Sequence, residues 1–247
     1  MADVKVSIIT VCFNSESTIA RTVESVLRQT YGNIEYIIVD GGSVDKTLSI
    51  IRSYEKQFNG RMKIISESDN GIYDAMNKGI LMASGDIIGM VNSDDYYEKN
   101  TVENVINFYQ NDNAHVIFYG FQRDLLRGKE IDVVFYHHRN LRKININHPT
   151  CFVTSDVYKD YGMYDIRYKS SADYEFLLRM YLSGKVKFVP IYKILSNFEL
   201  GGTSLSGLSV SETADILRSK HLISRKEYLL RKLWAKVYRW KQTIIMR

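Results

Sequence analysis

The chain has 247 residues, of which 45% are hydrophobic and 25% are charged. This mixture excludes disordered and fibrous proteins, and the length fits one large domain with an appendage. A chain of this size buries about three quarters of the surface that its unfolded form exposes, so its core needs no disulfide or structural metal. We expect Cys12 and Cys151 to be buried thiols, because both lie in apolar runs.

The net charge of +5 conceals an uneven distribution. Residues 218–247 hold ten Lys or Arg and one acid, which gives this tail +9 and leaves −4 on residues 1–217. The main body is therefore a poor candidate for binding nucleic acid. The chain opens without a secretory signal, and no window holds the roughly 18 consecutive apolar residues of a spanning helix. We expect a cytoplasmic protein that does not cross a membrane.

Strand-like and helix-like patterns alternate over the first 110 residues. Continuous apolar runs predict strands at Val6–Phe13, Ile34–Val39, Met62–Ser66 and Ile87–Val91. Apolar residues at helical spacing predict helices near 19–27, 45–58, 72–83 and 102–109. This alternation is typical of an α/β fold with a mostly parallel sheet and helices on both faces.

The rhythm changes after residue 115. The runs 116–121 and 131–136 predict a hairpin or a mixed extension of the sheet. Further on, the pattern predicts a strand at 151–154, a helix at about 173–182, and strands near 186–189 and 192–197. No repeat or linker interrupts the chain, so we expect one domain over residues 1–208 and a basic helical tail over residues 209–247.

Polar residues follow three of the predicted parallel strands, and ligands of open α/β sheets bind beyond such strand ends. Thr10 and Asn14 end the first strand, and Asp40, followed by two glycines, ends the second. Asp40 can accept hydrogen bonds from a nucleobase or a ribose hydroxyl. Asp94 and Asp95 follow the fourth strand, and a divalent cation such as Mg²⁺ or Mn²⁺ would offset their repulsion. Turn formation and helix capping are the structural alternatives.

Four more polar residues are candidates with an equally simple structural explanation. Asp69 precedes a predicted helix whose N-terminal amides can face an anion. Lys78 can pair with Asp74 on one helix surface, His148 can be structural, and Asp173 can cap a helix. The chain has neither a G-x-G-x-x-G nor a P-loop motif, so no standard phosphate-binding loop accounts for these segments.

Taken together, five motifs resemble the family 2 glycosyltransferases, which are inverting enzymes of the GT-A fold. The order and spacing of the motifs make the resemblance specific, and it covers roughly residues 4–205. It is strongest to the branch that builds bacterial exopolysaccharides such as colanic acid. The motifs are Thr10–Asn14, Val39–Asp45, Asp69–Gly79, Asn92–Asp95 and Ala172–Tyr174.

The resemblance implies a site for a nucleotide-sugar donor and a role for each matching residue. The implied donor contacts are Thr10, Asn14, Glu16, Asp40, Asp69 and Asp94. Asp95 is the implied contact to a divalent metal, Mn²⁺ or Mg²⁺, and Asp173 is the implied catalytic base. His148 and Lys78 are candidates for contacts with the acceptor or the diphosphate.

The sequence departs from the family pattern at three places. Ser93 stands at the first position of the usual D-x-D motif, and Ala172 stands where a Glu commonly precedes the catalytic Asp. Met76 occupies a position at which many relatives have an arginine.

The function implied by the resemblance is metal-dependent, inverting sugar transfer. The donor would be a nucleotide sugar, with UDP as the expected carrier, and the acceptor a hydroxyl of a saccharide or lipid-linked saccharide in bacterial surface polysaccharide synthesis. Two alternatives are a sugar-nucleotide nucleotidyltransferase and a non-enzymatic membrane adaptor. The first usually carries a glycine-rich, lysine-containing loop after its first strand, which is missing here.

The tail combines its ten cations with leucines and two tryptophans. This pattern predicts an interfacial helix on anionic lipid, and hence a peripheral position on the inner face of the cell membrane. The alternative is a solvated basic helix that packs on the body.

Overall fold

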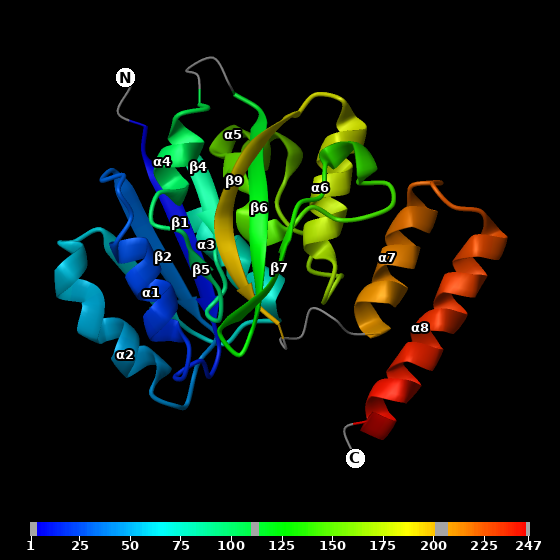
Figure 1. Cartoon of the computed structure of the whole chain (residues 1–247), viewed down its shortest axis with the longest axis horizontal. Helices are drawn as coiled ribbons and strands as arrows, with labels where there is room; N and C mark the ends of the chain where they lie inside the picture. Colours follow the sequence, from blue (N-terminus) through cyan, green and yellow to red (C-terminus); the bar gives the residue numbers. More distant parts are fainter. Residues whose placement is uncertain (1–3, 110–113, 201–206, 246–247) are drawn as a thin grey trace.

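Nine strands form one mixed sheet at the centre of the fold (Figure 1). The computed structural model describes residues 4–109, 114–200 and 207–245. In chain order the strands are β1 (Val6–Cys12), β2 (Ile34–Asp40), β3 (Met62–Ser66), β4 (Ile87–Met90), β5 (Tyr96–Tyr97), β6 (Val116–Leu126), β7 (Lys129–Val134), β8 (Phe152–Thr154) and β9 (Lys187–Glu199). Their order across the sheet is β3-β2-β1-β4-β8-β6-β9-β5, and β7 pairs with β6.

Most of the sheet is parallel, as the alternating pattern predicts. β1 pairs in parallel with β2 and β4, β2 pairs with β3, and β6 pairs with β9. Because β8 is antiparallel to both β4 and β6, β6 and β9 run in the same direction as the first four strands. The carboxyl ends of these strands therefore meet at one edge of the sheet, at the bottom of Figure 1.

Helices cover both faces of the sheet and give the fold three layers. They are α1 (Ile19–Leu27), α2 (Thr47–Tyr54), α3 (Ile72–Met82), α4 (Thr101–Ile106), α5 (Ser155–Tyr161), α6 (Ala172–Ser183), α7 (Gly207–Ser219) and α8 (Arg225–Ile245). One buried cluster joins the sheet to α3, α5, α6 and α7, and a second joins it to α1, α2 and α4. Ile8 and Ile9, neighbours in β1, belong to different clusters, because successive strand residues point to opposite faces.

Several elements differ from the sequence-based expectation. The two strands predicted near 186–189 and 192–197 are one strand, β9, whose register with β6 shifts beside Gly120 and Phe121. This irregularity breaks the apolar alternation, so the pattern looks like two strands. The helix predicted over 45–58 is α2 followed by the 3-10 turn Glu55–Phe58. β5 and α5 were not predicted, because two and seven residues are too few to show a period.

The C-terminal extension is helical, as predicted, and its first helix belongs to the core. Ile216 and Leu217 of α7 are fully buried and lie in the same cluster as α3 and α6. The carboxylate of Glu212 accepts hydrogen bonds of 2.8 Å from the backbone N–H groups of Lys169 and Ser170. α7 is therefore docked on the segment that leads into α6.

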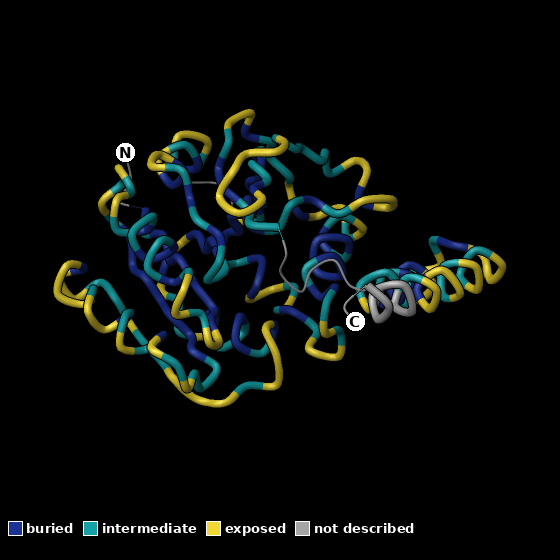
Figure 2. The backbone as a smooth tube through the Cα atoms, turned by 60° about the horizontal axis from the view of Figure 1, so that its bottom comes forward, coloured by how far each residue is buried: buried dark blue, intermediate teal, exposed yellow. Residues whose placement is uncertain are grey.

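α8 packs on α7 and projects from the body of the molecule (Figure 2). Tyr228 and Lys232 of α8 both bond to Asp215 of α7, at 3.0 and 2.8 Å. Within the ranges that the structure describes, no helix is long and apolar enough to cross a membrane.

Candidate active site

A cavity of about 760 Å³ lies where the strand ends meet. Its wall is built from distant parts of the chain, because the fold brings α3, β6, the loop 143–149 and the N-termini of α6 and α7 together. Tyr73, Asp124, Asn145, Asp173 and Thr213 each line it from one of these elements. The cavity is large enough for a sugar-sized ligand.

Asp173 is held in one orientation in the first turn of α6. The Tyr73 hydroxyl donates a hydrogen bond of 2.7 Å to its Oδ1, and the amide of Asn145 donates one of 2.8 Å to its Oδ2. Each carboxylate oxygen keeps lone pairs for a further donor. Helix capping does not explain the residue, because its side chain bonds to α3 and the loop 143–149 and not to its own helix. Asp173 is therefore fixed and can accept a proton from a ligand in the cavity.

His148 lines the same cavity, and its Nε2 lies 2.7 Å from the hydroxyl of Tyr164. Burial lowers the pKa of His148, and nearby Asp173 acts in the opposite direction. The net effect favours the neutral imidazole at pH 7.

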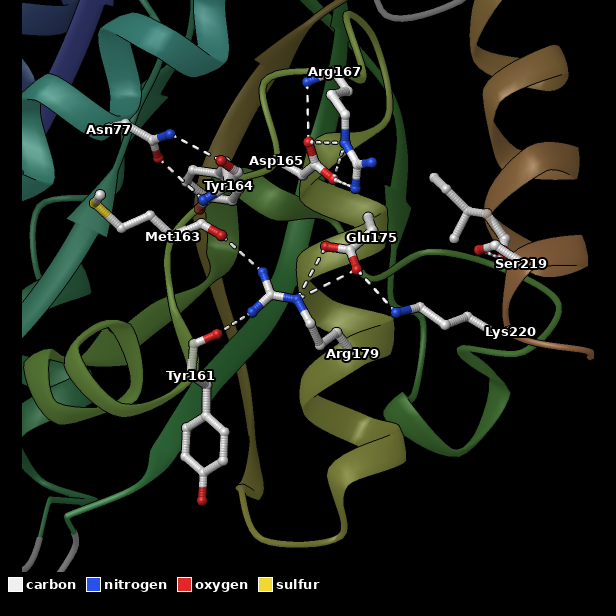
Figure 3. Close-up of polar contacts among 11 residues, drawn as sticks. Asn77, Tyr161, Met163, Tyr164, Asp165, Arg167, Glu175, Arg179, Ser219 and Lys220 are labelled. Carbon is white, nitrogen blue, oxygen red and sulfur yellow. Dashed lines mark hydrogen bonds and ion pairs between the residues drawn. The ribbon is translucent and has the colours of Figure 1, made fainter.

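The segment that carries Tyr164 is anchored on both sides, as Figure 3 shows. Asn77 of α3 bonds to both the backbone N–H and the carbonyl of Tyr164, at 3.0 and 2.9 Å. Arg179 of α6 donates hydrogen bonds to the carbonyls of Tyr161 and Met163. These bonds position Tyr164, and through it His148, with respect to α3 and α6.

Arg179 is itself held by a buried acid. Glu175 is only 5% exposed and pairs with Arg179 at 3.1 Å and with Lys220 at 3.3 Å (Figure 3). Lys220 follows α7, so this charge cluster connects the extension to the helix that carries Asp173. The two cations offset the cost of burying the charge of Glu175, and removal of either cation would destabilise the fold.

Asp94 and Asp95 follow β4 and differ in their surroundings. Asp95 is fully buried, and its carboxylate accepts hydrogen bonds from the backbone N–H of Glu199 at 3.1 Å and from Asn92 at 3.2 Å. Burial, followed by the charge of Asp94, raises the pKa of Asp95 well above its ordinary value, and burial also raises the pKa of Asp94. Among the residues that the structure describes, no other side chain bonds to the Asp94 carboxylate.

This donor set fits a divalent cation. The two adjacent acids are penalised by burial, and a cation beside them would relieve the penalty. Mg²⁺ characteristically uses one or two protein carboxylates together with substrate phosphates, so a larger cluster is not required. No group of three or more His, Cys, Asp or Glu suited to a metal occurs within residues 4–109, 114–200 and 207–245. Asp94 has the freer carboxylate, and Asp95 fixes the loop against β9.

Asp40 lies at the end of β2 and is fully buried. Its carboxylate accepts hydrogen bonds from the backbone N–H of Ser43 at 3.1 Å and from the hydroxyl of Ser66 at 2.6 Å, and it also bonds to the Ser43 hydroxyl. Asp40 thus fixes the turn after β2 against the end of β3.

Asn14 and Glu16 join two loops at the sheet edge. The Asn14 side chain accepts a hydrogen bond of 2.9 Å from the N–H of Val44, and Glu16 accepts one of 2.9 Å from the N–H of Lys46. Both residues are exposed. Thr10 lies deeper, because its hydroxyl is buried and accepts a hydrogen bond of 2.9 Å from Tyr36.

Asp69 lies directly against Gly41. Its Oδ1 accepts a hydrogen bond of 2.8 Å from the N–H of Gly71, and a Cβ on Gly41 would lie 2.6 Å from its Oδ2. The absence of a side chain at Gly41 therefore gives the Asp69 carboxylate its place at the turn after β2.

Lys78 is already paired. Its ammonium lies 2.8 Å from Glu67, 2.9 Å from the carbonyl of Ser68 and 3.9 Å from Asp74. The hydrogen bond to Glu67 contributes most to raising the pKa of Lys78, and the charge of Asp74 also raises it. The predicted contact with Asp74 exists but is the longest of the three.

The fold gathers the predicted acids at one edge, but not in one cavity. Asp173 and His148 line the cavity, whereas Asp40 is buried at the end of β2 and Asp95 is buried in the loop after β4, with β1 between these two strands. Asn92 connects the two parts, because it lines the cavity and bonds to Asp95. The site is therefore an acidic strand edge that adjoins a deeper cavity.

Three residues that position the site were not predicted from the sequence. Tyr73 and Asn145 orient Asp173, and Glu212 of α7 holds the segment in front of α6. Tyr73 lies in a predicted helix, where packing in the core is enough to explain a large side chain. Asn145 lies in a loop that shows no hydrophobic periodicity. The alternation of Asn145 and Asn147 with isoleucines was the one available signal.

The chain is similar in sequence to known glycosyltransferases. The model of glycosyl transferase family 2 matches residues 7–165. A PGL/p-HBAD biosynthesis glycosyltransferase of Mycobacterium tuberculosis is 29% identical over 239 residues, which cover 96% of this chain and 93% of that protein. An uncharacterized glycosyltransferase of the same organism is 34% identical over 180 residues, or 70% of this chain and 68% of that protein.

Solved structures show the same fold. Staphylococcus aureus TarS 1–349 in complex with UDP-GlcNAc has a TM-score of 0.72 at 19% identity, covering 92% of this chain and 70% of that one. The mannosyltransferase PcManGT from Pyrobaculum calidifontis, in complex with GDP-Man and Mn²⁺, has a TM-score of 0.70 at 12% identity, covering 95% and 69%. In another TarS structure, this chain spans 41% of the TarS chain.

The family match also decides between the functional classes that the sequence left open, because it favours sugar transfer over nucleotidyl transfer and over a non-enzymatic adaptor. The chain belongs to glycosyl transferase family 2 and is a glycosyltransferase with the GT-A fold.

Proposed function

We propose that this glycosyltransferase moves a sugar, with inversion, from a nucleotide sugar to an acceptor hydroxyl with the help of Mn²⁺ or Mg²⁺. The observation that carries the proposal is the fixed carboxylate of Asp173 in a cavity that adjoins the acid pair Asp94 and Asp95. A sugar transfer with inversion needs a base for the acceptor hydroxyl and positive charge for the departing diphosphate, and Asn92, which lines the cavity and bonds to Asp95, connects the two parts of the site.

The donor would lie on the acidic strand edge. Its nucleoside would be surrounded by Asp40, Asp69 and the loop that holds Asn14 and Glu16. Thr10, which lies deeper, would support these residues. UDP is the carrier that we favour, since TarS, a structural neighbour, is described in complex with UDP-GlcNAc. Asp94 would face the sugar or the ribose. Asp95 would serve the metal, either by contacting it directly or by holding Asp94 toward it. When bound, the cation supplies positive charge for the departing diphosphate.

The acceptor would enter the cavity beside Asp173. Its hydroxyl donates a hydrogen bond to the carboxylate and attacks the anomeric carbon on the face opposite the diphosphate, while Asp173 takes the proton. Tyr73 and Asn145 keep the carboxylate aimed at that hydroxyl. His148, neutral and bound to Tyr164, would contact the acceptor or the diphosphate. Lys78, which is paired with Glu67, would reach the diphosphate only by leaving that partner.

The test is donor turnover with and without Asp173. Wild-type protein incubated with UDP-sugars and Mn²⁺ should release UDP, and Asp173→Asn should lower turnover about a hundredfold to ten-thousandfold, the range of a general base. Donor binding should persist in the variant. Asp132→Asn, which changes an exposed acid on β7, is the matched control. Undiminished turnover of folded Asp173→Asn would remove Asp173 from the mechanism.

We further propose that α8 binds an anionic membrane surface, as the acceptors of surface polysaccharide synthesis would require. Apolar side chains lie exposed along α8 at Leu229, Leu230, Leu233, Trp234 and Val237. Arg225, Lys226 and Lys236 are exposed among them. An exposed apolar face with cations suits anionic lipid, whereas a second copy of the same basic helix would be repelled.

Vesicle sedimentation tests this proposal on the full chain. Wild-type protein should pellet with phosphatidylcholine vesicles that contain phosphatidylglycerol and stay in solution with phosphatidylcholine alone. Replacing Leu230 and Trp234 by Gln should abolish pelleting, and Leu81→Gln, at an exposed position on α3, should not. Equal pelleting of the double variant and wild type would refute a role of α8 in lipid binding.

A further inference from the structure

The guanidinium of Arg21, in α1, bonds to the loop that carries the acid pair Asp94 and Asp95. Its Nη2 donates a hydrogen bond of 2.7 Å to the backbone carbonyl of Asp94 and lies 3.4 Å from the carboxylate of Glu199, which ends β9. The backbone N–H of Glu199 in turn donates a hydrogen bond of 3.1 Å to the carboxylate of Asp95. The ion pair of Arg21 and Glu199 is therefore bonded to both acids, with one acid at each partner.

The Arg21 side chain has little freedom to move. Its guanidinium lies over the ring of Tyr96, 4.7 Å from the ring centroid, and Tyr96 is itself paired with Asn197 across β5 and β9. A guanidinium is planar and carries donors that point in different directions, so it can bond to a carbonyl and a carboxylate while it stacks on a ring. A lysine ammonium has no such planar fork, and the arrangement therefore requires an arginine.

Two neighbouring residues bond to the same loop. The hydroxyl of Thr22, which is fully buried, donates a hydrogen bond of 2.6 Å to the carbonyl of Asp95, and the hydroxyls of Ser15 and Ser93 lie 2.8 Å apart. Together with Arg21, they attach three successive residues of the loop to α1 and to the segment before it. Of these three contacts, that of Arg21 is the one that brings a charge to the acid pair.

The charge of Arg21 and the position that it imposes on the loop affect a bound cation differently. Burial raises the pKa of both Asp94 and Asp95, and the charge of Arg21 acts against this increase. A positive charge beside the acids, taken alone, would also repel a divalent cation. A charge effect and a positional effect of Arg21 on metal binding therefore have opposite signs, and removal of the side chain distinguishes them.

We infer that Arg21 is a positioning residue of the metal site, which holds Asp94 and Asp95 where they bind Mn²⁺ or Mg²⁺ together with the donor diphosphate. The inference rests on the proposed function, of which the metal is a part. Arg21 acts through the backbone of the loop, because its guanidinium bonds to the carbonyl of Asp94. Its partner Glu199 extends this support to Asp95 and offsets the charge of Arg21.

Isothermal titration calorimetry of the full chain tests this inference. The probe is UDP or GDP, whichever the wild-type protein binds more tightly in the presence of Mn²⁺. The measured quantity is the metal enhancement, which we define as the Kd without Mn²⁺ divided by the Kd with Mn²⁺. Arg21→Ala should lower the metal enhancement about tenfold, the scale of one lost hydrogen bond to a charged group. Arg21→Lys keeps the charge but can hold only one of the two partners, so it should lower the enhancement about threefold.

Arg28→Ala is the matched control. Arg28 lies on the same helix, its side chain is 71% exposed, and it pairs with Glu24 at 2.8 Å. This variant should keep the wild-type metal enhancement. Thermal unfolding checks that each variant is folded, and Arg21→Lys carries the comparison if Arg21→Ala is not.

Two results would overturn the assignment of Arg21. A merely structural role would weaken nucleotide binding equally with and without Mn²⁺, and so would leave the metal enhancement unchanged. A higher enhancement in Arg21→Ala than in wild type would show that Arg21 acts only through its charge.

The outcomes also separate this inference from the proposed function. If wild-type protein binds the nucleotide equally well with and without Mn²⁺, the metal-dependent part of the proposed function fails, and the inference fails with it. If wild type shows a metal enhancement and Arg21→Ala keeps it, the proposed function stands and the role assigned to Arg21 is wrong.

Discussion

The hydroxyl of Tyr73 donates a hydrogen bond of 2.7 Å to Oδ1 of Asp173, although 100 residues separate them in the chain. Tyr73 is buried, and burial, followed by the charge of Asp173, raises its pKa well above the ordinary value. The phenol therefore stays protonated over the working pH range and always acts as the donor. This bond orients the carboxylate of Asp173, the proposed base, without taking part in proton transfer.

Tyr73→Phe should lower kcat about tenfold, because a hydrogen bond to a charged group contributes roughly 1.5–3 kcal/mol and part of that is lost when the carboxylate is free to turn. Steady-state kinetics at saturating donor measures the effect. Tyr54→Phe is a matched control, since Tyr54 donates to the carboxylate of Glu24 at 2.9 Å. An unchanged kcat in Tyr73→Phe would show that the hydrogen bond from Tyr73 is not needed to orient the carboxylate of Asp173.

Asp95→Asn should weaken the metal-dependent part of donor binding. In wild type, UDP at a hundredfold excess over its Kd with Mn²⁺ should stabilise the protein by about 2.7 kcal/mol. The variant should lose most of this stabilisation in a thermal-shift titration, and Asp94→Asn should lose at least as much because its carboxylate is freer. Equal donor affinity of wild type with and without Mn²⁺ would count against a metal at this pair.

Gly41→Ala should impair donor binding more than stability. The new Cβ would lie 2.6 Å from Oδ2 of Asp69, which is the far end of a side chain and can rotate away. The backbone then stays intact, but Asp69 leaves its place at the turn. Titration of UDP should show a weaker affinity, with a melting temperature close to that of wild type. Gly32→Ala, which meets no atom within 4 Å, is the control.

Glu212→Ala should reduce both stability and turnover. The change removes the acceptor of the N–H groups of Lys169 and Ser170, and a hydrogen bond to a charged group contributes about 1.5–3 kcal/mol. Since these residues precede α6, Asp173 should lose part of its orientation. Denaturant unfolding and kcat are the measurements. Glu227→Ala, which removes a partly exposed partner of Arg231 on α8, should change neither by a comparable amount.

Glu35 should make the fold sensitive to acid. Burial alone would raise its pKa, but hydrogen bonds from Ser7, Ser84 and Lys63 lower it to about 2. Because the folded pKa lies below the unfolded one, the stabilisation is present above about pH 4.5 and is lost as the pH falls toward 2.

Urea unfolding at several pH values checks this expectation. Glu35→Gln should be less stable than wild type at pH 7, and the difference should shrink as the pH approaches 3. Glu55→Gln, at an exposed position, should follow wild type throughout. A constant difference between wild type and Glu35→Gln over this range would contradict the assigned linkage.

Local sequence determined much of the fold. The apolar runs of β1 to β4 and the helical spacing between them predicted the parallel sheet, because burial on both faces requires such runs. The place of the acids was predictable as well. They follow parallel strands, and the carboxyl ends of these strands lie at one edge of the sheet because the strands run in the same direction. The motifs that resemble family 2 added the roles, and the family itself is confirmed.

Tertiary structure decided what each acid does. Nothing local distinguishes Asp94 from its neighbour Asp95. Yet the carboxylate of Asp94 has no side-chain hydrogen-bond partner in the part of the chain that the structure describes, whereas that of Asp95 is fully buried and bonds to the backbone N–H of Glu199, 104 residues away. Likewise, only folding brings Tyr73, Asn145 and Asp173 together, and only packing makes α7 part of the cavity wall. Hydrophobic periodicity records which face of an element is buried, but the partner that meets a polar side chain depends on contacts between distant segments.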